Sequence, residues 1–162
     1  MSVARDIIRT YFAPRETLRR KIGAGAREDR ALATLFGACI LIFIAQWPGL
    51  AREAHLNEGS ELDMLMGAAL FGWVFVAPLL LYALAAFSHI LARIFGGQGT
   101  WFRARMALFW ALLAASPLWL LHGLVKGFIG PGAALQAVGF LALGAFLVFW
   151  GTGLWEAEGR KA

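Results

Sequence analysis

Four long apolar segments, separated by short polar ones, dominate the pattern of the chain. None of them contains Asp, Glu, Lys or Arg, and they cover residues 31–50, 64–92, 106–125 and 132–155. A helix of about 20 residues crosses a hydrocarbon core of about 30 Å. The pattern therefore predicts an all-α fold, a polytopic bundle of four transmembrane helices. The second segment is longer than a perpendicular span needs, so we expect a tilted helix with Pro78 as the point for a kink.

The first 30 residues have a different pattern, and we treat residues 1–30 as a separate basic segment. Its apolar residues recur at helical spacing on the side opposite Arg5 and Arg9, and they are Val3, Ile7, Ile8, Tyr11 and Phe12. Pro14 interrupts this pattern. One or two short amphipathic helices lying on the membrane surface explain it, and a solvated basic tail is the alternative. Residues 156–162 form a short polar tail after the bundle of residues 31–155.

Charge indicates how the bundle is oriented. Of the 15 Lys and Arg residues, all but Arg52 and Lys126 lie in residues 1–30, the loop of residues 93–105 or the tail. Basic loops stay on the cytoplasmic side of a membrane. We therefore predict that both termini and this loop are cytoplasmic. Arg greatly outnumbers Lys, which is typical of a GC-rich genome and favours a bacterial inner membrane.

Composition excludes several classes of protein. Hydrophobic residues make up 60% of the chain and charged residues 15%, against about 25% charged in soluble domains. The net charge of +5 belongs to membrane-flanking positions rather than to a basic-aromatic module, so we expect no nucleic-acid partner. The single Cys39 lies inside a span and allows no intrachain disulfide.

No residue pattern points to catalysis. No span centre carries an ionisable Asp, Glu, Lys or Arg, and motifs such as H-E-x-x-H and G-x-S-x-G are missing from the sequence. His55 and His122 are expected at the outer side, where a loop carboxylate such as Glu53 or Glu58 could join them. Nothing in their spacing requires a metal. We predict a non-enzymatic protein without cofactor or metal.

The loop between the second and third spans is the candidate binding site. Its glycines are Gly96, Gly97 and Gly99, and its basic residues are Arg93, Arg103 and Arg105. Consecutive glycines allow backbone N–H groups to converge on an anion, and the arginines add positive charge. We expect a lipid head-group phosphate as the ligand. An ordinary turn with orienting arginines is the alternative.

Small residues at four-residue spacing mark candidate helix-packing faces. Such residues allow membrane helices to approach closely. They are Ala107, Ala111 and Ala115 in the third span, and Gly123 and Gly127 near its end.

The chain resembles the Yip1 family of small polytopic membrane proteins. The resemblance rests on residues 82–89, on the loop F-G-G-Q-G-T-W of residues 95–101, on Pro117-Leu118 and on P-R-E-T-L of residues 14–18. Eukaryotic members act in vesicle traffic and membrane organisation alongside small GTPases. The family is usually described with one more span than the pattern here predicts. The resemblance implies no catalytic residue.

Three functions are compatible with the sequence. The first is a protein that binds membrane phospholipids, anionic ones included, or partner proteins, and so organises the membrane. The second is an accessory subunit of a larger respiratory, photosynthetic or secretion complex, or a homo-oligomer. The third is a transporter or channel for a small uncharged solute. The uncharged spans offer no coupling residue, which ranks the third function last.

Overall fold

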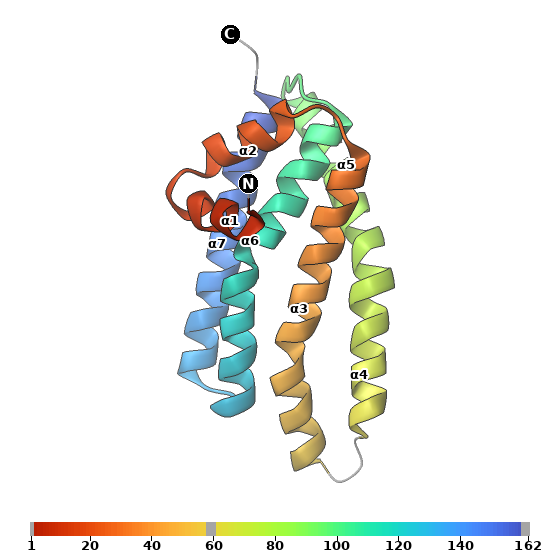
Figure 1. Ribbon diagram of the computed structural model, residues 1–162, viewed down its shortest axis with the longest axis vertical. Helices are drawn as coiled ribbons and strands as arrows, with labels where there is room; N and C mark the ends of the chain where they lie inside the picture. Colours follow the sequence, from red (N-terminus) through yellow and green to blue (C-terminus); the bar gives the residue numbers. More distant parts are fainter. Residues whose placement is uncertain (1, 58–60, 160–162) are drawn as a thin grey trace.

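A computed structural model describes residues 2–57 and 61–159, and within those residues all regular structure is helical. In chain order the elements are α1 (Val3–Phe12), α2 (Pro14–Gly23), α3 (Glu28–Leu56), α4 (Leu62–Phe71), the π-helical η1 (Gly72–Val76), α5 (Ala77–Ile94), α6 (Trp101–Phe128) and α7 (Ala133–Glu158) (Figure 1).

Among the described residues, four helices are long and apolar enough to cross a membrane. They are α3, the continuous helix Leu62–Ile94 formed by α4, η1 and α5, then α6, and α7. The predicted all-α, four-span fold is confirmed, and the chain is a multi-pass membrane protein. Each helix extends beyond its apolar segment, because backbone hydrogen bonding continues past the residues that meet hydrocarbon.

The long helices run alternately down and up, so that the chain returns to the same end of the bundle (Figure 1). That end holds the hairpin of α1 and α2, the loop of residues 95–100 and the last turn of α7. We call it the basic end. The distribution of Lys and Arg predicted that these segments lie on one side of the membrane, and that this side is cytoplasmic stays a prediction.

α6 is the centre of the packing. Every residue from Met106 to Ser116 is buried, because α3, α5, α7 and the N-terminal hairpin all pack on this helix. Pro117 follows and cannot donate a backbone hydrogen bond to the carbonyl of Leu113. The Ser116 hydroxyl donates to that carbonyl instead, at 2.7 Å, and thus satisfies it within the helix.

The small residues of α6 lie where neighbouring helices come closest. A Cβ atom on Gly123 would lie 1.8 Å from the backbone oxygen of Ala45 in α3, and one on Gly127 would lie 2.3 Å from Pro48. Ala107 faces Gly153 of α7. The remaining members of the repeat, Ala111 and Ala115, are buried, and Ala111 packs with Phe149.

The helix Leu62–Ile94 lies at the periphery. α4 and η1 contain no buried residue, and large apolar side chains such as Phe71, Phe75 and Leu79 are exposed, as on a lipid-facing surface. The distortion predicted at Pro78 takes the form of the π-helical turn η1, directly before α5. A π-turn removes the need for the hydrogen bond that a proline cannot donate.

Candidate functional site

The glycine-rich loop closes over the C-terminal end of α7. Its backbone N–H groups already have acceptors inside the chain. The N–H of Gly97 donates to the carbonyl of Ala92 at 2.8 Å, and that of Gln98 donates to the carbonyl of Glu158 at 3.0 Å. The N–H of Gly99 donates to the Glu158 carboxylate, also at 3.0 Å. The loop therefore binds an anion, and that anion is the chain's own Glu158.

Glu158 is held from a second side by His89 of α5. The Nδ1 atom of His89 lies 2.5 Å from the Glu158 carboxylate, and both side chains are buried. The ring of Trp101 packs against the imidazole, with 4.5 Å between the two ring centroids. The contact joins α5, α7 and the start of α6, so its main effect is to fasten three helices together at the basic end.

Two of the loop glycines are required by this geometry. Gly96 has a φ of +89°, a left-handed conformation that residues with a Cβ atom rarely adopt. A Cβ atom on Gly99 would lie 2.5 Å from the backbone oxygen of Ala157 and 2.6 Å from the Glu158 carboxylate. The glycines thus permit close contact with α7 as well as a turn.

The arginines of the loop do not converge on one point. Arg93 is exposed, and Arg103 is partly exposed in the first turn of α6. Arg105 forms an ion pair with Glu28 at the start of α3, and its guanidinium lies 5.8 Å from the ring centroid of Tyr82. At the predicted head-group site, the backbone N–H groups of the loop therefore donate to acceptors within the chain, and the three arginines do not surround a common point.

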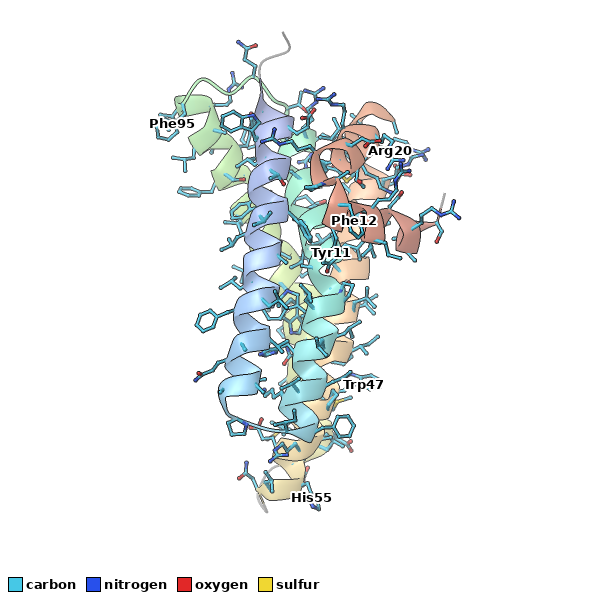
Figure 2. All side chains as sticks on the ribbon, turned by 90° about the vertical axis from the view of Figure 1, so that its left-hand side faces the viewer. Tyr11, Phe12, Arg20, Trp47, His55 and Phe95 are labelled. Carbon is cyan, nitrogen blue, oxygen red and sulfur yellow. The ribbon has the colours of Figure 1, made fainter. Side chains whose placement is uncertain are left out.

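A second group of basic residues lies on the other flank of the basic end. Figure 2 shows Phe95, the first residue of the loop, and Arg20, on the N-terminal hairpin, on opposite sides of the bundle. Between this hairpin and the flanks of α3 and α6 is an open cavity of about 830 Å³, which we call the N-terminal cavity. Its basic lining residues are Arg20, Lys21 and Arg30, and its one acidic lining residue is Asp6.

A buried polar network holds the hairpin against α6. Asp6 is only 4% exposed and accepts a hydrogen bond from Lys21 Nζ at 2.5 Å. Lys21 also lies over the ring of Trp110, at 4.3 Å from its centroid. The indole N–H of Trp110 donates to the hydroxyl of Thr10 at 3.1 Å. A further bond runs from the Tyr11 hydroxyl to the carbonyl of Ala114.

Asp6 stays ionised in this network. Burial alone would raise its pKa, but the hydrogen bond from Lys21 and the positive charges of Lys21 and Arg20 hold the pKa of the carboxyl below its ordinary value of 3.8. The carboxylate is therefore fully charged near neutral pH and neutralises part of the positive charge of the cavity.

Arg20 differs from its neighbours in having donors without acceptors. Its Nε and Nη2 atoms are buried and have no hydrogen-bond partner among the described residues. The closest carboxylate oxygen is on Asp6, 3.9 Å from Nη2. In Arg19 and in Arg27 the same two nitrogen atoms donate side by side to Glu156 and to Asp29.

Sequence reasoning missed this second group. The basic residues of the segment were visible, but their pattern predicted a membrane-surface helix or a solvated tail. No signal in the sequence shows that Asp6 and Thr10 point inward. An amphipathic pattern identifies the polar and apolar faces of a helix, but not which part of the protein packs against each face.

The described residues contain no group of three His, Cys, Asp or Glu side chains close enough to hold a metal. His55 is exposed at the end of α3, and His122 lies against Gly139 of α7. Glu58, one of the carboxylates considered with them, lies outside the described residues.

The sequence model of the Yip1 domain matches residues 8–162, which is nearly the whole chain. No curated protein and no solved structure is significantly similar to the chain.

Proposed function

The chain belongs to the Yip1 family, and we propose that it is a non-enzymatic protein of a bacterial inner membrane that organises this membrane by binding anionic phospholipids. The observation that carries the proposal is that the basic residues of α1, α2 and residues 93–105 lie at one end of a four-span bundle. Each Lys or Arg held near an anionic leaflet contributes about 1 kcal/mol of attraction.

α1 adds an apolar contribution to membrane binding. Ile8 and Phe12 are 62% and 86% exposed, and no other part of the described chain covers them. An amphipathic helix of this kind inserts its apolar face at the boundary between head groups and acyl chains. The basic end therefore offers both charge and apolar surface to the same leaflet.

Lipid analysis of the intact protein tests this proposal. The protein is extracted with its surrounding lipid in polymer nanodiscs, and its phospholipids are compared with those of the whole membrane. We expect enrichment of phosphatidylglycerol or cardiolipin that weakens at high salt, because salt screens exposed charges. A lipid composition equal to that of the bulk membrane would contradict the proposal.

Orientation is a separate part of the proposal, since lipid binding by the basic end requires that this end face the cytoplasm. In a Cys39→Ala background, one cysteine is placed at Asn57 and another, in a second variant, at Gln98. A membrane-impermeant thiol reagent applied to intact spheroplasts should label the first site and spare the second. The reverse pattern would invert the topology.

An accessory role in a larger membrane complex is the second candidate. It is supported by the helix Leu62–Ile94, in which only 6% of an apolar 18-residue stretch is buried, so that this helix would accept a partner helix as readily as lipid. Blue-native electrophoresis separates the two candidates. A large stoichiometric complex favours the accessory role, and a monomer or small oligomer favours the lipid-binding role.

A further inference from the structure

We propose that the N-terminal cavity is a binding site for one anionic phospholipid, with the lipid phosphate at Arg20 and Lys21 and one acyl chain between α3 and α6. The inference rests on the proposed lipid-binding function and assigns it a site. That site lies on the flank opposite the glycine-rich loop.

The head group is identified by the unpaired edge of Arg20. Buried N–H donors without an acceptor are costly, and nearly all such donors in proteins have a partner. The Nε and Nη2 atoms of Arg20 are the pair that binds carboxylate or phosphate in two parallel hydrogen bonds. The Oδ1 atom of Asp6 also has no hydrogen-bond partner among the described residues, but it lies 3.9 Å from Nη2, beyond hydrogen-bonding distance.

Charge favours an anion in the same place. Three basic side chains line the cavity against a single carboxylate, so it retains positive charge after Asp6 is counted. Lys21 uses one of its three donors on Asp6 and has others to offer. The head group of phosphatidylglycerol has a phosphate and no ammonium group. It therefore complements the positive charge of the cavity better than the zwitterionic head group of phosphatidylethanolamine does.

The apolar part of the cavity fits one acyl chain. Below the basic residues it is lined by Gly37, Ile40 and Leu41 of α3 and by Met106 and Leu113 of α6. The 11 helical rises from Arg30 to Leu41 correspond to about 16 Å of helix. This is close to half of the roughly 30 Å hydrocarbon core, the depth of one leaflet. Ile40 is 47% exposed, so the cavity opens sideways toward the membrane.

Gly37 keeps this space open. A Cβ atom there would meet only the Leu113 side chain, at an ordinary 3.9 Å, whereas one on Gly123 would strike the backbone of α3. Close helix packing therefore explains why residue 123 is a glycine, but it does not explain the glycine at position 37. The missing side chain at Gly37 leaves room between α3 and α6 for a ligand.

Native mass spectrometry of the full chain, titrated with phosphatidylglycerol, tests the site. We expect one tightly bound lipid per chain and weaker binding of phosphatidylethanolamine. Arg20→Gln should reduce the phosphatidylglycerol affinity about tenfold or more, because it removes a charged pair of donors. Arg15→Gln is the matched control. It removes the same charge from the exposed side of α2, outside the cavity lining, and should change the affinity less than about twofold.

Gly37→Leu tests the acyl-chain part with a fold-safe change. Leucine is a better helix former than glycine, so the melting temperature should stay equal or rise. The new side chain should nevertheless fill the cavity and weaken phosphatidylglycerol binding. Inorganic phosphate in millimolar excess should not displace the lipid. Displacement would show that the head group alone binds, and would overturn the acyl-chain assignment.

The results separate this inference from the proposed function. If wild type, Arg20→Gln and Gly37→Leu all bind phosphatidylglycerol equally well and better than phosphatidylethanolamine, the cavity is not the site and the lipid-binding function stands. If wild type shows no preference for phosphatidylglycerol, both proposals fail.

Discussion

The basic end of this protein contains two anion-binding arrangements, one closed and one open. In the glycine-rich loop, the backbone amides and His89 surround the carboxylate of Glu158, which belongs to the same chain. In the N-terminal cavity, Asp6 pairs with Lys21 but leaves the donor edge of Arg20 without an acceptor. In the first arrangement the bound carboxylate stabilises the fold. In the second, hydrogen-bond donors remain that could bind a ligand.

The largest effect is expected from Glu158→Ala. The substitution leaves the buried His89 and the half-buried amide of Gly99 without their acceptor, and at about 1–3 kcal/mol for each unsatisfied donor the loss should be about 2–5 kcal/mol. The free energy of unfolding in detergent, measured with denaturant, should fall by an amount in this range. Glu156→Ala removes a carboxylate two residues earlier whose partner, Arg19, is 74% exposed, so it should cost at most about 1 kcal/mol. Equal losses would refute the closed arrangement.

Gly99→Ala should have the next largest effect. The added Cβ would press against the backbone oxygen of Ala157 at 2.5 Å, and overpacking of this kind costs about 1–3 kcal/mol. Gly144→Ala in the middle of α7 is the control, because nothing lies within 4 Å of its Cβ position. That variant should be as stable as wild type or more stable. A thermal melt that ranks the two variants the other way would place the loop away from α7.

Trp110→Phe should have a smaller effect, confined to the other flank. The ring remains under Lys21, but the hydrogen bond to Thr10 is lost, at a cost of about 1 kcal/mol. Hydrogen exchange should become faster in α1 and α2 and stay unchanged in residues 95–100. Trp155→Phe, at a 72% exposed position, is the control. Faster exchange in the loop as well would mean that the two arrangements are coupled.

Of these changes, mild acidification from neutral pH should have the smallest effect on the stability of the N-terminal hairpin. The pKa of Asp6 is lowered in the folded chain, so its contribution to stability is complete above 3.8 and is lost as the pH falls through the lowered value. Hydrogen exchange of α1, corrected for the intrinsic rate, should rise only in that acidic window. Asp6→Asn should remove this dependence. A transition near neutral pH would show that another group controls the hairpin.

The fold was largely predictable from the sequence, because the absence of charge over about 20 residues is a direct consequence of crossing hydrocarbon. A proline inside an apolar segment and glycines at four-residue spacing are also local signals, and they mark the π-helical turn before Pro78 and the close approach at Gly123. Helix ends were less predictable. α7 continues to Glu158, inside the segment that the sequence assigned to a polar tail, because Glu158 is buried there.

The binding sites were only partly predictable. The glycine pattern of residues 96–99 correctly indicates an amide-rich turn, but the occupant comes from a residue 59 positions away from Gly99. Local spacing carries no information about such a partner. The N-terminal cavity depends on Trp110 and Gly37 from two separate helices, so no single stretch of sequence describes it.

The most direct test of the account is a solid-state NMR measurement of lipid contacts in phosphatidylglycerol bilayers, with the arginine guanidinium nitrogens labelled. We predict an immobile contact between arginine nitrogen and lipid phosphorus, stronger than the contacts of the exposed arginines, that is lost in Arg20→Gln and persists in Arg103→Gln. A contact that survives loss of Arg20 and disappears with Arg103 would place the head group at the glycine-rich loop and contradict the account.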